Sequence, residues 1–239
     1  MTVARTARDR ARQEITAEIL AAGRAQLHRT GPSELSLRAV ARDVGMVSSA
    51  VYRYFASRDE LLTALIIAAY DELGAAAEAA DEAVEDRTDH LARWQATCRA
   101  TREWSVAHPH DYALIYGSPV PGYAAPQDTV MPATRVIVRL VEIIVGAHAS
   151  GHTSGAAAPP AGAVDPSPVV ADAMAFIAEH SDISLEALPE LVMRTLMAWS
   201  TIFGTLSFEL FGHLKGSVSD YESYFEQTTL RLAGDLGLA

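Results

Sequence analysis

The sequence of 239 residues predicts an all-α protein, and three observations support this fold class. Apolar residues recur at intervals of three and four along most of the chain, which is the spacing of one face of an α-helix. Alternating Val, Ile and Thr runs closed by Asn-Gly or Asp-Gly turns, which mark β-hairpins, do not occur in the sequence. Hydrophobic residues make up 49% of the chain, enough to bury a core and to exclude disorder over most of its length.

Stop and start signals divide the N-terminal part of the chain into four expected helices. Gly31 with Pro32 ends the first helix, and Gly45 ends the second. Ser36 is expected to cap the second helix, and Ser57 with Glu60 forms a capping box that opens the fourth. The four helices are expected over residues 8–29, over 36–43, over a short segment ending at 55, and from 57 through at least 73.

Five further helices are expected in the rest of the chain, over residues 89–107, 128–147, 169–180, 188–214 and 220–236. Ser219 and Glu222 read as the capping box of the last one. Residues 117–122 are predicted to form a loop, and residues 146–168, rich in Gly, Ala, Ser and Pro, a flexible linker. The expected domains are 1–57 and 58–239.

Charge is distributed unevenly along the chain. The formal net charge of −11 argues against a general nucleic-acid coat protein, but residues 1–60 carry +3 and the remainder carries −14. Such a distribution suggests that the N-terminal part contacts a polyanion, although solvated helix faces also carry uneven charge.

Several classes of protein are excluded. A single cysteine, Cys98, allows neither an internal disulfide nor a cysteine zinc site. No apolar run follows the basic N-terminus, and the apolar stretch 195–208 is too short for a membrane span of about 20 residues. The His and Asp residues at 108–111 lack the spacing of a metal site. We expect a cytoplasmic protein with no cofactor, no metal and no catalytic residue.

Residues 37–56 fit the twenty-residue helix-turn-helix template. Ala41 supplies the small residue that two crossing helices need, and Gly45 supplies a turn residue that adopts positive φ easily. Val40, Val44 and Val51 are expected to form a small core that makes one face of the second helix protrude. Such a face commonly enters the major groove of DNA, where side chains contact base edges and phosphates.

The candidate DNA contacts lie on this face and beside it. We expect Ser48 and Ser49 to reach bases or phosphates and Ala50 to meet a thymine methyl group. Tyr52, Arg53 and Tyr54 are expected to reach phosphates. Arg38 suits a guanine contact, and Arg58 lies at a helix start suited to phosphate. Arginines 5, 8, 10 and 12 could form an arm along the DNA. The alternative is a plain helical hairpin in which the tyrosines only pack. The candidates are Arg38, Ser48, Ser49, Ala50, Tyr52, Arg53, Tyr54 and Arg58.

These residues resemble the DNA-binding domain of TetR-type transcriptional regulators over residues 8–70. The resemblance lies in the segments LRAVA before Gly45, VYRYF at 51–55 and SRDEL at 57–61. It implies phosphate contacts for Tyr52, Tyr54 and Arg58 and a base contact for Arg38. Val47 departs from the pattern, because many members have a capping Ser there; Ser48 is expected to take over the cap.

The C-terminal part resembles the subgroup of this family named for a Trp-His-Gly pattern. The resemblance rests on Trp104-Ser105, His108-Pro109, the loop at 117–126 and the segment 199–213, with Phe203 where the pattern has His.

The expected helix at 188–214 is apolar on more than one side, whereas a surface helix needs only one apolar stripe. The second face predicts a homodimer interface made with the terminal helix; the alternative is a fully buried central helix in a monomer. The interface candidates are Trp199, Phe203, Gly204, Ser207, Phe208, Phe211 and Tyr224.

Aromatic and soft side chains gather around the middle helices. They are expected either to line a mostly apolar effector pocket or to form the core of the domain. These candidates are Trp94, Cys98, Trp104, His108, Tyr112, Tyr116, Tyr123 and Met131.

The sequence therefore predicts a homodimeric repressor that a small-molecule effector releases from a near-palindromic DNA operator. A helical small-molecule carrier or enzyme with a vestigial helix-turn-helix is the alternative. The effector, the operator sequence, the target genes and the choice between repression and activation are left open.

Overall fold

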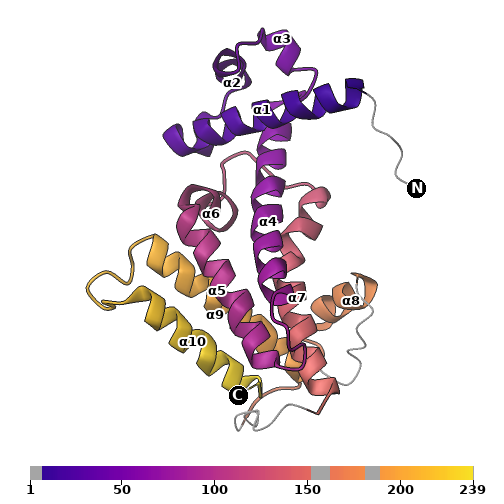
Figure 1. Ribbon diagram of the computed structural model, residues 1–239, viewed down its shortest axis with the longest axis vertical. Coiled ribbons are helices and arrows are strands. Elements are labelled where there is room, and N and C mark those ends of the chain that lie inside the picture. The colour runs from indigo at the N-terminus through magenta and orange to yellow at the C-terminus, as the bar shows by residue number, and fades with distance from the viewer. Residues whose placement is uncertain (1–6, 152–161, 181–188, 239) are drawn as a thin grey trace. The chain divides into compact units, whose positions relative to one another are not determined.

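The computed structural model describes residues 7–151, 162–180 and 189–238. Within these ranges the chain forms α-helices, two short 3₁₀ helices and no strand, which confirms the all-α fold class (Figure 1). The α-helices are α1 Ala7–Thr30, α2 Leu37–Asp43, α3 Ser48–Val51, α4 Arg58–Glu82, α5 His90–Ala107, α6 Pro109–Tyr116, α7 Val130–Ala149, α8 Ala171–His180, α9 Pro189–Leu210 and α10 Tyr221–Asp235.

The chain divides into two compact units. The first comprises Met1–Asp71 and His110–Pro132, and the second comprises Glu72–Pro109 and Ala133–Ala239. Helix α4 begins in the first unit and ends in the second. The functional division after residue 57 stays a prediction, because these units are defined by packing.

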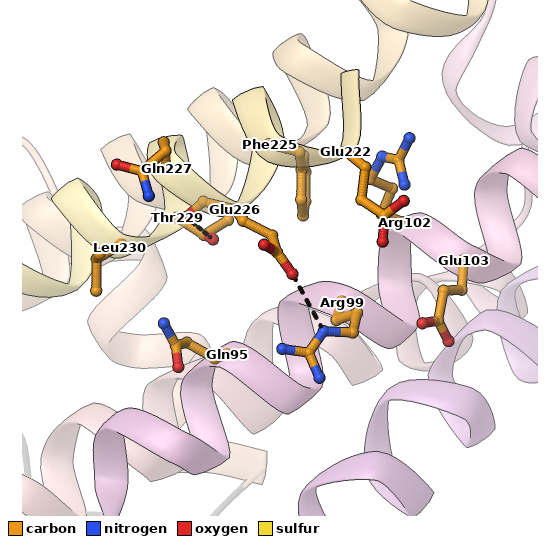
Figure 2. A pocket seen from close by; sticks show the side chains of 10 residues that line it. All are labelled: Gln95, Arg99, Arg102, Glu103, Glu222, Phe225, Glu226, Gln227, Thr229 and Leu230. Atoms are coloured by element: carbon orange, nitrogen blue, oxygen red, sulfur yellow. Dashed lines mark hydrogen bonds and ion pairs between the residues drawn. The ribbon is translucent and has the colours of Figure 1, made fainter. Parts of the chain in front are cut away.

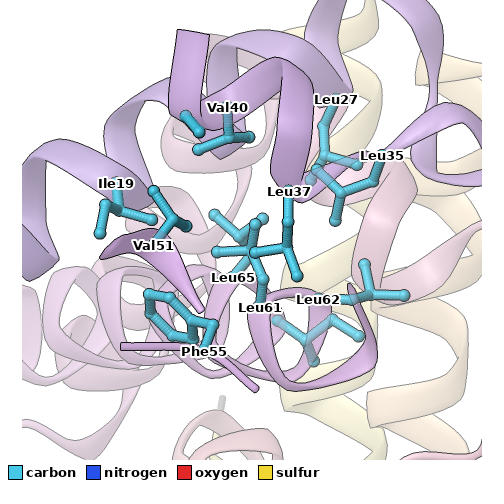
Figure 3. Packing of buried hydrophobic residues seen from close by; sticks show 12 residues of the cluster. Ile19, Leu27, Leu35, Leu37, Val40, Val51, Phe55, Leu61, Leu62 and Leu65 are labelled. Carbon is cyan, nitrogen blue, oxygen red and sulfur yellow. The ribbon is translucent and has the colours of Figure 1, made fainter. Parts of the chain in front are cut away.

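The first unit is built around one hydrophobic cluster to which α1, α2, α3 and the start of α4 contribute (Figure 3). Its side chains point toward one another from all four helices, and each fully buried one contributes about 1.5–3 kcal/mol of hydrophobic free energy. The cluster holds Ile19, Leu27, Leu35, Leu37, Val40, Ala41, Val51, Phe55, Leu61, Leu62, Leu65 and Ile66.

The predicted ends of the first helices are confirmed. Gly31 has φ 78° and donates its N–H to the Leu27 carbonyl at 2.8 Å, so α1 ends there. At the start of α4, the Ser57 hydroxyl accepts from the Glu60 N–H at 3.1 Å. The Glu60 carboxylate reaches back to the Ala56 N–H at 2.7 Å, one residue before the serine.

Three predicted caps are wrong. Ser48 does not take over the cap of α3, because Val47 is the N-cap residue and no side chain makes a capping hydrogen bond there. Ser36 precedes α2 but its side chain makes no capping hydrogen bond. Asp220, and not Ser219, caps α10, accepting from the Ser223 N–H at 3.0 Å. The carboxylate takes this role because α10 begins one residue later than expected, at Tyr221.

The second unit packs α10 against α9 and α5, and α9 also against α5 and α8. The Trp94 indole N–H donates to the Thr229 carbonyl at 3.0 Å, which joins α5 to α10 inside the core. The largest fully buried side chains of this unit include Leu140, Ile143, Ile144, Ile202, Leu206 and Phe225.

Several helix boundaries differ from the predictions. Helix α9 ends at Leu210 and not at residue 214. Pro109 was expected only to end α5, but it also begins α6, because proline suits the first position of a helix, where its missing N–H has no helical partner. Helix α7 continues to Ala149, so residues 146–149 do not belong to the predicted linker; Ala147 is fully buried, and its packing extends the helix. Residues 152–161 of that linker lie outside the described residues.

By length and composition, α9 is the one described helix that could cross a membrane. The predicted stretch of 14 residues is therefore part of a longer apolar helix of 22 residues. Arg194 and Thr195 within it are buried in the second unit, and the Arg194 guanidinium donates to the Asp235 carbonyl at 2.9 Å. The apolar composition of α9 thus serves the packing of this unit.

Candidate functional site

The helix-turn-helix consists of α2 and α3, which pack against each other in the first unit. Gly45 has φ 68°, and the Met46 N–H donates to the Ala41 carbonyl at 2.8 Å, which fixes the turn. Val40, Ala41 and Val51 are buried, as the template predicts.

The second helix of the motif is shorter than predicted, because α3 ends at Val51 and not at Phe55. The chain nevertheless stays coiled: the Arg53 and Tyr54 N–H groups donate to the carbonyls three residues earlier at 3.2 and 2.9 Å. Such hydrogen bonds are typical of a tighter 3₁₀-like turn. Phe55, buried at its end, holds this turn on the cluster.

The outward surface of the motif is polar and basic. Arg38, Ser49, Tyr52 and Arg53 are exposed, and Ser48 is half-buried. Arg42 is exposed as well, a basic residue of the motif that the sequence reasoning did not select. This surface presents guanidinium and hydroxyl groups, the donors that phosphates and base edges accept from.

One predicted DNA contact is wrong. Ala50 is only 8% exposed, because the side chain faces the helices behind α3 and not solvent. Little of the side chain is therefore open to a thymine methyl group in a major groove.

Tyr54 packs and does not simply protrude. Its ring lies half-buried against the hydrophobic cluster, with the Arg12 guanidinium 5.1 Å from the ring centroid. Arg8, Arg10 and Arg12 belong to α1, so these three do not form an extended arm. Arg5 lies outside the described residues.

Arg58 joins the start of α4 to the loop before α2. Its guanidinium donates to the Pro32 carbonyl at 2.7 Å and to the Asp59 carboxylate at 3.0 Å. The side chain is still 31% exposed, so a phosphate contact for Arg58 stays a prediction.

The candidate effector residues fall in both compact units. In the second unit, Trp94 and Cys98 are core residues, and burial raises the pKa of the Cys98 thiol above its usual value. The Trp104 ring stacks on His108 with centroids 5.0 Å apart. The buried Trp104 indole N–H donates to no acceptor in the described part of the chain.

The other four candidates lie in the first unit. Tyr112 is fully buried, with its ring centroid 5.1 Å from that of Tyr116, and burial raises the pKa of the Tyr116 phenol. The Tyr123 hydroxyl lies 2.9 Å from the Thr63 hydroxyl. Met131 is half exposed.

A groove on the second unit lies between α5 and α10, and Figure 2 shows its lining side chains. Arg99 and Glu226 face each other across it at 3.6 Å, and Phe225 also lines it. None of the eight candidate effector residues lines this groove. Its lining consists of Gln95, Arg99, Arg102, Glu103, Glu222, Phe225, Glu226, Gln227, Thr229 and Leu230.

The candidate dimer residues divide into exposed and buried ones. Phe203 is 6% exposed and packs in its own chain, so its assignment to the interface is wrong. Trp199 lies half-buried beside it, with ring centroids 5.9 Å apart. Gly204, Phe208, Phe211 and Tyr224 are exposed, and Ser207 is half-buried.

Five of the exposed residues of α9 and of the turn directly after it form a regular stripe, which we call the α9 seam. Their spacing alternates between four and three residues, the repeat of helices that pack along one another. The seam includes Met197, which the sequence reasoning missed although it is apolar and in register. The seam comprises Met197, Thr201, Gly204, Phe208 and Phe211.

The sequence reasoning also missed a charged cluster around Asp81 in the second unit. This fully buried carboxylate accepts from Arg93 at 2.7 Å and from Arg87 at 2.9 Å, and Arg139 lies 3.3 Å away. Burial alone would raise the pKa of Asp81, but the hydrogen bonds and charges of Arg93 and Arg87 outweigh it and lower the pKa. The partners come from three separate segments, so spacing along the sequence carries no signal of the cluster.

A second cluster lies in the first unit, where the sequence reasoning considered and rejected a metal site. The buried Asp111 carboxylate accepts from Arg24 at 2.8 Å and lies 3.4 Å from His28, whose ring stacks on His110. Among the described residues, no group of three or more His, Cys, Asp or Glu side chains is arranged to hold a metal ion.

Comparison with known proteins identifies the family. The family described as "Bacterial regulatory proteins, tetR family" matches residues 19–65, and "Tetracyclin repressor-like, C-terminal domain" matches residues 94–232. HTH-type transcriptional regulator Rv1816 of Mycobacterium tuberculosis is 40% identical over 205 residues, 84% of this chain and 83% of that protein. The resemblance to the Trp-His-Gly subgroup is not tested by these matches and stays a prediction.

Solved structures agree with this result. SCO4313, for which a regulatory role is proposed, has a TM-score of 0.70 and 33% identity, covering 96% of this chain and all of that one. A protein of unknown function from Rhodococcus sp. RHA1 has a TM-score of 0.66 and 25% identity, covering 91% and 92%. Rv1816 is named as a transcriptional regulator, and the matched family consists of regulators and not enzymes. The chain therefore belongs to the TetR family of bacterial transcriptional regulators, which bind DNA through the helix-turn-helix.

Proposed function

We propose that this regulator is a cytoplasmic homodimeric repressor that a small-molecule effector releases from a near-palindromic operator. The observation that carries the DNA-binding part is the exposed basic surface of a helix-turn-helix with a well-packed core. Residues 1–57 would bind DNA, and the helical remainder would dimerise and bind the effector.

Direct readout of bases would fall to the exposed residues of the motif. Arg38 and Arg53 carry charge at an exposed surface, and Ser49 adds a hydroxyl group. Because the ring of Tyr54 is packed, Tyr54 would contact DNA through its hydroxyl group alone. Arg58 would keep one side of its guanidinium on the Pro32 carbonyl and turn the other toward a phosphate.

The α9 seam supports the dimer. The stripe exposes Met197, Phe208 and Phe211, which is unfavourable in water. Its alternating spacing of three and four residues suits packing against the same stripe of a second copy across a two-fold axis. Gly204 lies in the middle of the stripe, and no atom from elsewhere in the described part of the chain comes within 4 Å of the place a Cβ would take, so two backbones could approach there. Two-fold symmetry places the two half-sites about 34–36 Å apart or further.

The Trp104 indole N–H supports the effector site. A buried N–H without an acceptor costs about 1–3 kcal/mol, and an effector with a hydrogen-bond acceptor would offset that cost. Trp94 and Cys98 have core roles that explain their burial without a ligand. Effector binding would favour a dimer whose two DNA-binding domains no longer fit successive major grooves. The size of this shift is limited by the difference between the effector's affinities for the two states.

Selection of genomic fragments by the purified protein tests the proposal. We expect enrichment of a near-palindromic duplex whose affinity falls steeply with salt, because Arg–phosphate contacts release counterions. Failure to enrich any such site would reject the repressor, whereas turnover of a small molecule would favour the alternative of a carrier or enzyme. A promoter–reporter measurement then separates repression from activation.

A further inference from the structure

Val47 is an exposed apolar residue at the entry to α3. The side chain is 70% exposed, and among the large hydrophobic residues that the structure describes only Val164, at 73%, is more exposed. The residue directly precedes Ser48, the first residue of α3, and side chains at the start of the second helix of such a motif commonly reach base edges.

The backbone fixes this exposure. Val47 has an extended conformation of the polyproline II type, with φ −72° and ψ 142°, in which successive side chains point in different directions. Met46 packs against the hydrophobic cluster, whereas Val47 is not part of it and is exposed. The Val47 carbonyl accepts from the Ala50 N–H at 2.9 Å, which ties the residue to the first turn of α3.

The exposed basic residues of the motif that contains Val47 point to DNA as the partner of this side chain. The exposed residues of the same motif include Arg38, Arg42 and Arg53, and positive charge complements phosphates and not a second apolar protein surface. In the major groove, the apolar group that distinguishes one base from the others is the C5-methyl group of thymine. Ala50, which the sequence suggested for such a contact, is buried.

We propose that Val47 reads a thymine methyl group in each half-site of the operator. The inference rests on the proposed DNA-binding function and adds a specificity-determining residue to it. A capping Ser at this position would give up an apolar base contact for a hydrogen bond to the helix start.

The test replaces each thymine of a selected operator with deoxyuridine, which removes only the methyl group. At one thymine in each half-site, we expect this replacement to lower the affinity of the wild-type protein about fourfold. That is the contribution of one buried methyl-sized group to the binding free energy. Val47→Ala and Val47→Ser should bind the thymine operator more weakly and should no longer distinguish thymine from deoxyuridine at that position. Val164→Ala removes the same groups from an equally exposed valine and should keep the discrimination.

The outcomes are separable. If both Val47 variants keep the full thymine preference, or if no thymine methyl affects wild-type binding, the inference is overturned while the DNA-binding function stands. The same holds if Val47 contacts another protein, because thymine preference would then be unchanged by the substitutions. If the wild-type protein binds no duplex, both the proposed function and this inference are rejected.

Discussion

Asp81 is the residue on which most of the buried charge of the second unit depends. Its carboxylate is fully buried and pairs with Arg93, Arg87 and Arg139, which come from α5, from the loop before it and from α7. Removing one partner of such a cluster lowers the free energy of unfolding by more than the intact cluster contributes to it. The reason is that the remaining buried charge loses its partner.

Asp81→Asn should lower the free energy of unfolding by about 3–5 kcal/mol, since the almost buried Arg93 would keep its charge without a carboxylate. Urea denaturation at neutral pH measures the change. Glu85→Gln removes the same charge from an exposed position on the adjoining loop and should have little effect. Equal losses from the two variants would contradict the role of Asp81.

The same carboxylate predicts a pH dependence. Because the pKa of Asp81 is lower in the folded protein than in the unfolded chain, acid protonates the unfolded state first and destabilises the fold. The advantage of wild type over Asp81→Asn should be complete above about pH 4 and should shrink as the pH falls further. An advantage that grew on acidification would show that the sign of the pKa shift is wrong.

Arg38 and Arg58 differ in surroundings and should differ in effect. Arg38 is exposed and suits a contact with a base edge. Arg38→Ala should therefore reduce the preference for one base pair, at one position per half-site, by about 1–3 kcal/mol of binding free energy. Arg58→Ala should weaken all sequences alike and reduce the salt slope by about 1. Fluorescence anisotropy with an operator and its single-base variants measures both. Equal loss of preference from the two variants would refute the assignment, and thermal unfolding controls for the lost Pro32 contact.

At the scale of elements, the turn between α2 and α3 sets the position of the recognition surface. Its conformation depends on one glycine, because Gly45 has φ 68° and a side chain strains the left-handed region whatever the space around it. Met46 and Phe55 then anchor the two ends of α3 on the hydrophobic cluster.

Gly45→Ala should therefore destabilise the protein by about 1–2 kcal/mol and weaken operator binding. Gly234→Ala is the matched control, since Gly234 also has no atom within 4 Å of a built Cβ but lies inside α10. There the alanine should stabilise by about 0.5–1 kcal/mol through its better helix propensity. Chemical unfolding compares the two, and a stabilising Gly45→Ala would contradict the role of the turn.

At the scale of the whole molecule, the exposed α9 seam bears on the oligomeric state. Phe208 is 53% exposed and Phe211 is exposed beside it, whereas their neighbour Phe203 is buried within the chain. Two faces of the same apolar helix thus have different roles: one completes the core of the second unit and the other faces outward.

Phe208→Glu should weaken the proposed dimer by about tenfold or more, since a buried aromatic residue at an interface centre commonly contributes 2 kcal/mol or more. Sedimentation velocity over a range of concentrations measures the change. Val106→Glu places the same charge on an exposed apolar position of α5 and should leave the association unchanged. Association that survives Phe208→Glu unaltered would move the interface away from the α9 seam.

The sequence by itself determined the features that depend on neighbouring residues. Gly31 and Gly45 ended helices, Ser57 with Glu60 opened one, and apolar residues at helical spacing gave the all-α fold and the core of the helix-turn-helix. The basic N-terminal segment and the motif together gave the family. These signals are local, because backbone dihedral angles and caps involve residues within one turn of each other.

Only the tertiary structure decided which apolar and charged side chains face inward. Ala50 is buried while Val47 is exposed, Phe203 is buried while Phe208 is exposed, and Asp81 collects three arginines from separate segments. In each case helical spacing permits either side, and the choice depends on which other elements pack against the helix. Those contacts join residues far apart in the chain, so burial and ion pairing follow from the packed fold and not from spacing along the sequence.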